Sequence, residues 1–377
     1  MKATTPVILT VNCGSSSLKY GLFSQSGTPE QLHSGQIRDI GKLPVKDMEA
    51  AVDQLIALLN ERFSDYEITA IGHRMVQGGL QHMEPEKVTD QLLSSLSKLT
   101  SLAPDHLPAE LAAIRAFAQV FPQATQIVCF DTAFHQHMPF AARHYALPRR
   151  LWEQGLLRYG FHGLSYEYIM QQLQQTAPET VNGRIIIAHL GNGASMAAVH
   201  KGRSIDTTMG LTPAGGLVMS TRPGDLDPGV ILYLLKEQKM STDELNELLN
   251  KQAGLKAVSG KASDIEDLLE TAAEHDHAAE AIDLFCYQAR KYTGALAAAM
   301  GGLDTFIFTG GIGEHAAEIR QCICEGLEFL GMHIDTIQNE QAAAVISARG
   351  SAVIIRVIPT SEEQMIAQHT RQWLQQH

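Results

Sequence analysis

The sequence is poor in basic residues, in cysteine and in long apolar runs. Lys and Arg number 29 against 41 Asp and Glu, and the formal net charge of -12 argues against a broad nucleic-acid or acidic-membrane surface. The five cysteines are odd in number and lack zinc-site spacing, which predicts free thiols rather than disulfides. No apolar run approaches the roughly 18 residues of a membrane span, and residues 1–11 are too polar for a signal peptide. We expect a cytoplasmic protein with no nucleic-acid or membrane partner, which captures anionic ligands locally.

Length and periodicity predict an α/β protein with two domains. With 377 residues, 45% of them hydrophobic, the chain can bury two sizeable cores. Strand-like runs alternate with amphipathic helical patterns, which is typical of mixed sheets covered by helices. We expect strands over 8–11, 68–73, 126–130, 185–188, 305–308 and 352–358, and helices over 47–63, 280–300, 316–330 and 362–374. The boundary is expected just after Asp131, with residues 1–131 and a C-terminal helix over 364–377 in one lobe and 132–363 in the other.

Three Gly-rich segments follow strand-like runs. The first, Asn12-Cys-Gly-Ser-Ser-Ser17, leads into a strand that carries Lys19, and His189-Leu-Gly-Asn-Gly-Ala-Ser195 repeats the strand–turn–strand pattern. Backbone N–H groups and hydroxyls gathered in this way suit a phosphate, although the first segment alone is equally well explained as an ordinary Ser-rich hairpin. The third, Thr309-Gly-Gly-Ile-Gly-Glu-His315, precedes a helical pattern, as in turns that approach a nucleotide closely. The repeat predicts two related lobes, and no segment fits G-x-x-x-x-G-K-[ST], which excludes a Walker-type site.

Charged residues follow several of the strand-like runs, where α/β sheets place ligands. Arg74 precedes a flexible Gly pair and Arg222 lies in a Gly/Pro-rich loop. Each is a candidate for a bidentate grip on a carboxylate or phosphate, with a surface ion pair as the alternative. Asp131 ends a strand, but Ala133 stands where a phosphatase-type nucleophile needs a second Asp, so we interpret Asp131 as positioning magnesium or water.

The histidines divide into two groups. His162, in Tyr159-Gly-Phe-His-Gly163, is either a ligand-binding residue or a buried structural histidine, and the sequence leaves both open. The pairs His135/His137 and His275/His277 have i,i+2 spacing, which points them apart on a helix, so we expect surface residues.

Taken together, these strings resemble the acetate kinase family, within the sugar kinase, Hsp70 and actin superfamily. The motifs that carry the resemblance extend over nearly the whole chain: Val11-Asn-Cys-Gly-Ser-Ser-Ser-Leu-Lys19, Gly72-His-Arg-Met-Val-Gln-Gly-Gly79, Phe130-Asp-Thr-Ala-Phe-His135, Tyr159-Gly-Phe-His-Gly163, His189-Leu-Gly-Asn-Gly-Ala-Ser195, Thr221-Arg-Pro-Gly-Asp-Leu-Asp-Pro-Gly229, Thr309-Gly-Gly-Ile-Gly-Glu314 and Pro359-Thr-Ser-Glu-Glu363. The resemblance implies a two-lobed, actin-like ATPase fold with a duplicated mixed-sheet core and an active-site cleft between the lobes. It also implies a homodimer and Mg²⁺-dependent (or Mn²⁺-dependent) phosphoryl exchange between ATP or ADP and a short-chain carboxylate.

The resemblance assigns roles to individual residues. Asn12 and His162 are expected to contact the transferred phosphoryl group, and Arg74 and Arg222 to hold the carboxylate and the transition state. Asp131 and Glu362 are expected to position the metal through waters, with Asn12 beside it, although Glu362 and Glu363 at a helix start also suit the helix dipole. Val76, Phe161 and Pro213 fall where the family builds its apolar pocket for the acyl chain. The implied nucleotide and phosphate contacts are Ser17, Lys19, His189, Gly191, Asn192, Gly193, Asp264, Gly310, Gly311, Ile312, Gly313 and Glu314.

Two departures from the family pattern bear on specificity. Asp105, in Ala103-Pro-Asp-His-Leu107, brings a carboxylate to the acyl pocket, where it must turn outward, pair with a cation such as Arg74, or meet a polar group on the substrate. We favour the first two outcomes. Glu266 replaces an Arg that lies against the adenine, which weakens stacking. The alternatives to acetate and ATP are therefore propionate or a polar short acid, a donor such as pyrophosphate, or a nucleotide-binding switch without turnover.

Overall fold

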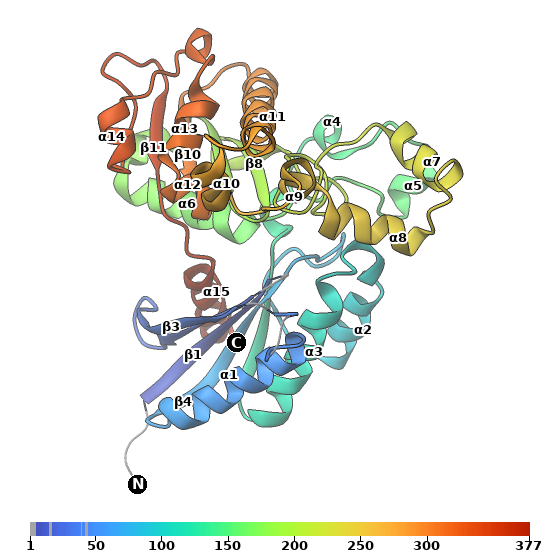
Figure 1. The fold of residues 1–377 in the computed structure, drawn as a ribbon. Coiled ribbons are helices and arrows are strands. Elements are labelled where there is room, and N and C mark those ends of the chain that lie inside the picture. Colours follow the sequence, from blue (N-terminus) through green and yellow to red (C-terminus); the bar gives the residue numbers. More distant parts are fainter. Residues whose placement is uncertain (1–4, 15–16, 39, 42–43) are drawn as a thin grey trace. The chain divides into compact units, whose positions relative to one another are not determined.

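The computed structural model describes residues 5–14, 17–38, 40–41 and 44–377, and the chain divides into two compact units (Figure 1). Unit 1 comprises residues 1–134, 162–168 and 361–377, and unit 2 comprises residues 135–161 and 169–360. Ser15 and Ser16 of the first Gly-rich segment lie outside the described residues. The lobe boundary expected after Asp131 stays a prediction.

Unit 1 is built on a six-stranded mixed sheet with the order β3-β2-β1-β4-β6-β5. β1 pairs antiparallel with β2 and parallel with β4, and β4 pairs parallel with β6. The strands are β1 (Thr5–Cys13), β2 (Leu18–Ser24), β3 (Gln31–Ile37), β4 (Tyr66–Met75), β5 (Glu86–Lys87) and β6 (Thr125–Phe130), and the helices are α1 (Met48–Arg62), α2 (Asp90–Ser97), α3 (Leu107–Val120) and α15 (Glu362–Gln376).

Alternation along β1 and β4 divides the core of unit 1 between two faces of the sheet. Val7, Leu9 and Val11 pack with residues of α1 and α3, whereas Ile8 packs with Ala367 of α15. On β4, Gly72 faces α15 so closely that an added Cβ would lie 2.5 Å from Ile366 Cγ2. The final helix therefore returns across about the whole length of the sequence to cover one face of the first sheet.

Unit 2 repeats the strand order of unit 1. Its five-stranded sheet has the order β11-β10-β7-β8-β9, so the hairpin β7–β8–β9 corresponds to β1–β2–β3, and β10 and β11 correspond to β4 and β6. The strands are β7 (Arg184–Leu190), β8 (Ala194–His200), β9 (Arg203–Thr207), β10 (Thr305–Thr309) and β11 (Ile354–Val357). The α/β class is confirmed, and so is the duplicated mixed-sheet core that the family resemblance implies.

Unit 2 contains helices on both sides of β10 in the sequence. They are α4 (Phe140–Arg143), α5 (Arg149–Glu153), α7 (Pro228–Lys236), α8 (Thr242–Glu247), α9 (Gly254–Ser259), α10 (Ile265–Thr271), α11 (Asp276–Met300), α12 (Gly310–His315), α13 (Ala317–Cys324) and α14 (Thr336–Glu340), while α6 (Gly163–Thr176) contributes residues to both units. The Ala-rich α11 packs on β7, β8 and β9. The helix expected over 316–330 is wrong in its bounds, because the Gly-rich segment is itself the helix α12, and Gly326 with a φ of 82° follows α13.

Composition predicts free cysteine thiols and no membrane-spanning segment. All five cysteines are free, as predicted, and Cys322 is the most accessible of them. Within the part of the chain that the structure describes, no helix is both long enough and apolar enough to cross a bilayer.

Candidate active site

Strand ends bring three of the predicted site residues of unit 1 together. Asn12 lies near the end of β1, Arg74 near the end of β4, and Asp131 directly follows β6. Because these three neighbouring strands are parallel, their carboxyl ends meet at one edge of the sheet. Asn12 and Arg74 also occupy the same strand face as Ile8 and Gly72, the face that α15 covers, so the start of α15 reaches them.

Arg74 is the centre of this cluster. Its Nε lies 3.1 Å from Asp131 Oδ1 and its Nη2 lies 2.6 Å from Asp131 Oδ2, so the pair is bidentate. Nη1 donates to Asn12 Oδ1 at 3.1 Å, and Glu362 Oε2 lies 3.9 Å from Nε. Burial disfavours the guanidinium charge, but Asp131 and Glu362 outweigh burial and raise the pKa of Arg74. Arg74 therefore stays positively charged at any working pH.

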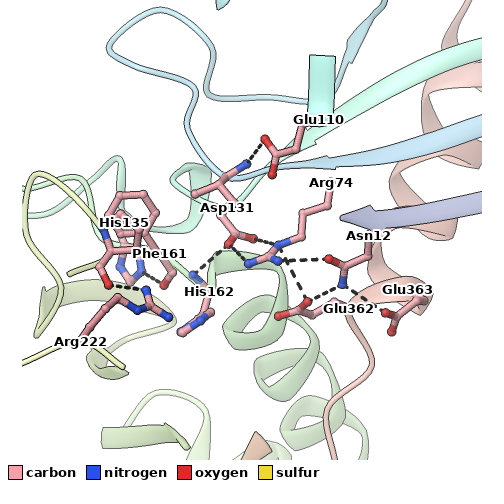
Figure 2. Close-up of polar contacts among 12 residues, drawn as sticks. Asn12, Arg74, Glu110, Asp131, His135, Phe161, His162, Arg222, Glu362 and Glu363 are labelled. Atoms are coloured by element: carbon pink, nitrogen blue, oxygen red, sulfur yellow. Dashed lines mark hydrogen bonds and ion pairs between the residues drawn. The ribbon is translucent and has the colours of Figure 1, made fainter. Parts of the chain in front are cut away.

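Asn12 connects the guanidinium to the first turn of α15 (Figure 2). Its Nδ2 donates to Glu362 Oε2 at 2.8 Å and to Glu363 Oε1 at 3.1 Å, while its Oδ1 accepts from Arg74. The Asn12 amide thus has its NH2 group bonded to carboxylates and its oxygen bonded to a guanidinium. We therefore expect a rigid arrangement of the cluster.

His162 joins the cluster through its backbone. Its N–H donates to Asp131 Oδ2 at 3.2 Å, and its φ of 58° is left-handed, which is uncommon outside glycine. Gly163 makes this turn possible, because an added Cβ there would lie 1.9 Å from the Asp131 carbonyl oxygen. Complete burial raises the pKa of Asp131, and Arg74 and the His162 N–H act against that shift. The imidazole itself is only half-buried, which favours the ligand-binding interpretation of His162 over a buried structural histidine.

In unit 2, the second and third Gly-rich segments converge. They follow the parallel strands β7 and β10, where His189 lies opposite Thr309. A Cβ on Gly191 would lie 4.0 Å from the Gly311 backbone nitrogen, and one on Gly310, whose φ is 77°, would lie 2.7 Å from the Leu190 carbonyl oxygen. Glu314 Oε1 accepts from the N–H groups of Gly310 (2.9 Å) and Thr360 (3.0 Å). Gly311 itself is exposed, with open space where a side chain would be, so a ligand can approach its backbone.

The loop that carries Arg222 is tied to the β7–β8 hairpin. Ser220 donates through its N–H to the Asn192 carbonyl (3.2 Å) and through Oγ to Asn192 Oδ1 (3.2 Å). Arg222 Nη1 donates to the Pro213 carbonyl at 2.6 Å. Gly254, with a φ of 66°, lets α9 approach the loop, since a Cβ would lie 2.1 Å from the Met219 carbonyl oxygen. Arg222, Pro213 and the candidate phosphate hairpin thus belong to one interconnected region of unit 2.

The other residues predicted to contact the nucleotide or its phosphates lie in several different elements. Lys19 is exposed, lies opposite Asn12 in the β1–β2 register, and borders a hollow of about 400 Å³ with Arg38 and Glu363. The Ser17 carbonyl closes the first turn by accepting from Gly14 N–H at 2.8 Å. Asp264 is the N-cap of α10, accepting from Glu266 N–H at 2.9 Å, which is a structural role. Ile312 and Gly313 lie within α12.

Asp105 and the acyl-pocket residues differ in burial. Val76 and Phe161 are buried, and Pro213 is partly buried. Asp105 is exposed, and Arg74 contacts Asn12, Asp131 and Glu362 rather than Asp105 among the described residues. Of the three outcomes considered for Asp105, the structure has the outward-facing one.

His135 is buried, so the expectation of a surface residue is wrong for it, whereas His137, His275 and His277 are exposed as expected. His135 Nε2 lies 3.1 Å from the Phe161 carbonyl and Nδ1 lies 2.8 Å from Ser204 Oγ. A neutral imidazole that donates to the carbonyl and accepts from the hydroxyl satisfies both contacts. The i,i+2 argument failed because His135 lies in a short 3₁₀ turn, not on a long helix.

Sequence reasoning also missed Glu110, in the first turn of α3. Its side chain is buried, and Oε2 accepts from the Val76 N–H at 3.2 Å. Burial raises the pKa of Glu110 to about 8, with Arg74 and the Val76 N–H acting in the opposite direction. A glutamate three residues into an amphipathic helix carries no signal that it faces inward, so only the packed structure identifies it.

A metal ion would have to be held by few protein ligands. Among the described residues, no group of three or more His, Cys, Asp or Glu side chains could hold one. Arg74 occupies both oxygens of Asp131, and Asn12 donates to Glu362 and Glu363. This donor set fits Mg²⁺, which keeps several of its waters and takes only one or two carboxylates.

Comparison with known proteins decides the family. Residues 7–368 match the model of the acetokinase family. The chain belongs to the acetokinase family. It is 44% identical to an acetate kinase of Rhodopseudomonas palustris (strain TIE-1) over 388 residues, covering 96% of this chain and 97% of that one. Among solved structures it is similar to a propionate kinase from Francisella tularensis (36% identity, TM-score 0.91, covering 97% and 99% of the two chains) and to the acetate kinase of Porphyromonas gingivalis (35%, 0.86, 98% and 100%).

Membership of the acetokinase family confirms the resemblance stated from the motifs and the class of enzyme. The chain is a phosphotransferase with a carboxyl group as acceptor, and the family uses ATP. The solved relatives include one named for acetate and one named for propionate, so the choice of acid rests on the site itself.

Proposed function

We propose that the chain transfers the terminal phosphoryl group of ATP to acetate, giving acetyl phosphate and ADP, and catalyses the reverse reaction. The observation that carries this proposal is Arg74, a guanidinium kept charged by Asp131 and Glu362 at the edge of the first sheet. An acceptor with a pKa of roughly 4 to 5 is already ionised at neutral pH and needs no general base. The enzyme must instead bring two anions together, which is the task of fixed cations.

The proposed roles follow from this demand. Arg74 and Arg222 hold the acceptor carboxylate and stabilise the charge on the equatorial oxygens of the transferred group. Asn12 and the half-buried His162 contact that group, and Val76, Phe161 and Pro213 enclose the methyl group. The small apolar set of pocket residues and the outward-facing Asp105 favour acetate over a hydroxylated acid.

The nucleotide is proposed to bind along the converging Gly-rich segments of unit 2. The exposed backbone of Gly311, beside Gly191, allows the close approach that phosphates need. His189, Asn192 and Gly193 belong to the same hairpin, and Lys19 supplies charge from the first hairpin. Asp264 and Glu266 flank the start of α10, and Glu266 stands where the family resemblance places an arginine against the base.

Mg²⁺ or Mn²⁺ is proposed as the metal, positioned by Glu362 and Asp131 through waters, with Asn12 beside it. When bound, it neutralises charge on the nucleotide phosphates. Asn12 orients Glu362 by donating to Oε2 at 2.8 Å, and Arg74 fixes Asp131, so both carboxylates are held before any ligand arrives.

A hydroxamate assay of acyl phosphate formation tests the proposal. Purified protein with ATP and magnesium is assayed with acetate, propionate, butyrate and glycolate, and then with GTP and pyrophosphate as donors. We expect acyl phosphate with acetate and ATP. Product only with glycolate, or only with pyrophosphate, would replace the acid or the donor, and no product with any pair would favour the nucleotide-binding switch.

We also propose that the protein is a homodimer. The helix α7 buries none of its residues and exposes Val230 (41%), Leu232 (53%) and Tyr233 (56%). An apolar helix face of this kind is typical of a surface covered by a partner. Light scattering after gel filtration should give twice the mass of 41.1 kDa, and Leu232→Asp should give a monomer. A monomeric wild type would contradict the proposal.

A cytoplasmic location is the last element of the proposal. Five free thiols, four of them buried, suit a reducing compartment. Cell fractionation of a tagged full-length protein tests it, and recovery outside the cytoplasmic fraction would contradict it.

A further inference from the structure

Glu110 lies on the opposite face of the first sheet from Glu362, and the two carboxyl groups approach the end of β4 at different residues, Val76 and Arg74. Glu362, on α15, lies 3.9 Å from Arg74 Nε. Glu110, on α3, accepts from the Val76 N–H at 3.2 Å, and Figure 2 shows this bond above the Arg74 cluster. The end of β4 is thus held between one carboxyl group from each covering helix.

The second oxygen of Glu110 has no ordinary structural explanation. Oε1 is buried and finds no hydrogen-bond partner among the residues that the structure describes. The carboxyl does not cap the N-terminus of its own helix either. No side chain caps α3, and the Glu110 carboxyl accepts from the Val76 N–H instead. An apolar side chain would avoid the cost of burying this group. A buried carboxyl with one bond, directed at the backbone of a pocket residue, therefore indicates a role in the site.

We propose that Glu110 is a positioning residue of the acceptor site, which fixes the Val76 backbone and through it Arg74, without touching the acid. This inference rests on the proposed function, since Val76 and Arg74 are assigned to the acceptor there. Val76 follows Arg74 by two residues, so a shift of its backbone moves both the pocket wall and the guanidinium.

The ionisation of Glu110 should also affect how strongly the site attracts an anionic acceptor. The charges that act on Glu110 are those of Arg74 on β4 and Asp131 after β6. Two further titratable groups lie nearby: the Cys13 thiol at the end of β1, whose pKa Glu110 raises, and His106, whose carbonyl accepts from the Glu110 N–H. Arg74 stays charged throughout, and burial raises the pKa of the Cys13 thiol, which stays neutral. Burial raises the pKa of Glu110 to about 8. Below that pH the carboxyl is neutral and the charge of Arg74 is available to an anionic acceptor. Above it, the new negative charge weakens the attraction for the carboxylate.

The test compares Glu110→Gln, Glu110→Ala and the wild type, with Asp90→Asn as the matched control. Asp90 is an exposed carboxylate in the first turn of α2. Gln keeps an acceptor for the Val76 N–H but cannot ionise. We expect Glu110→Ala to raise the KM for acetate at least tenfold at pH 7 and to leave the KM for ATP unchanged. Between pH 7 and 9 the KM for acetate should rise at least threefold in the wild type and less than twofold in Glu110→Gln. Asp90→Asn should behave like the wild type.

An unchanged KM for acetate in folded Glu110→Ala would overturn the proposal, and so would a pH-dependent rise in Glu110→Gln equal to that of the wild type. If the Ala variant does not fold, the comparison with Gln decides. Infrared difference spectra between pH 7 and 9 give a readout without turnover: the wild type should lose a protonated carboxyl band that Glu110→Gln lacks. If the wild type forms no acyl phosphate, the proposed function fails. The infrared result then decides separately whether Glu110 is protonated, and its absence overturns the inference.

Discussion

At the residue scale, the two arginines of the candidate site differ in what holds them. Arg74 is partly buried and forms a bidentate pair with the fully buried Asp131, so removing Arg74 would leave an uncompensated buried carboxylate, at a cost of about 3–5 kcal/mol of folding stability. Arg222 is half-buried and bonds a backbone carbonyl, so its removal leaves no buried charge unpaired at that bond. Arg222 is therefore the better residue for a test of catalysis without loss of the fold.

Arg222→Ala should lower kcat by at least about a hundredfold, the scale seen when one preorganised charge-stabilising donor is removed. The thermal midpoint should change little. Arg203→Ala, at an exposed arginine at the start of β9 in the same unit, is the control and should keep wild-type kcat. Steady-state kinetics of acetyl phosphate formation measure both. Near wild-type turnover in Arg222→Ala would show that this arginine serves only its loop.

Asp105→Leu should change kcat/KM for acetate by less than about twofold, because an exposed carboxylate is screened by water. The measurement is kcat/KM for acetate and for glycolate at one ionic strength. A tenfold fall for acetate would mean that Asp105 turns inward when substrate binds, and that the outward position seen here is not the working one.

At the scale of elements, α15 determines how the first site is assembled. Its N-cap Ser361 accepts from the Gln364 N–H, so the helix begins at Glu362, where the two carboxylates meet Asn12. Its second and third turns lie against β4 at Gly72, two residues before Arg74. The closeness of helix and strand depends on the absence of a side chain at this glycine.

Gly72→Ala should destabilise the protein by about 1–3 kcal/mol, the usual cost of overpacking a core. The added Cβ would lie 2.3 Å from Thr370 Oγ1 and 2.5 Å from Ile366 Cγ2. Gly294→Ala is the matched control, since that helical glycine of α11 has nothing within 4 Å of the new methyl group. The control should gain about 0.5–1 kcal/mol from helix propensity. Urea denaturation compares the two, and equal effects would contradict the close packing of α15 on β4.

At the scale of the whole molecule, each unit buries one neutral histidine. In unit 1 the His73 ring lies 5.8 Å from that of Phe117 at a tilt of 56°. The Gln126 amide, with its oxygen and nitrogen exchanged, donates to His73 Nε2 at 2.6 Å and to the Ile114 carbonyl at 3.2 Å. Burial lowers the pKa of His73 to about 4, and burial lowers that of His135 in unit 2 to about 4 as well. Both units therefore contain a group that resists protonation.

The contribution of the two buried histidines to stability should be lost between pH 6.5 and 4. In this window each histidine binds more protons in the unfolded chain than in the native one, so its contribution to the free energy of unfolding falls as pH falls. Each histidine should contribute about 2 kcal/mol between pH 7 and 5. Glu110 contributes with the opposite sign, because its raised pKa favours the native state at lower pH. The measurement is therefore the difference between the wild type and His135→Gln or His73→Gln, whose pH slopes should be shallower, with the exposed His275→Gln as control. Equal slopes in all variants would contradict the prediction.

Part of the fold was predictable because local patterns and tertiary packing agree. The buried residues Val52, Leu55 and Leu59 of α1 recur at helical spacing within the range expected to be helical, and Asp47 is the N-cap of that helix. Prediction failed where local signals conflict with packing. Three glycines favoured a turn after β10, yet Glu314 accepts the first N–H of the segment and α12 forms there. The spacing of His135 suggested a surface residue, whereas its bonds to Ser204 and Phe161 bury it.

The sequence by itself determined the two Gly-rich hairpins, the alternation of strands and helices, and a set of motifs specific enough to identify the family. These features depend on neighbouring residues, whose propensities are written in the chain. Only the tertiary structure decided that Asn12, Arg74, Asp131 and Glu362 form one cluster, because Asn12 and Glu362 are 350 residues apart and meet through strand order and the return of α15. It alone also decided that Asp105 faces outward and Glu110 inward. Asp105 and Glu110 are only five positions apart in the sequence. Whether each carboxyl group is buried depends on the elements that pack over it, which the local sequence does not show.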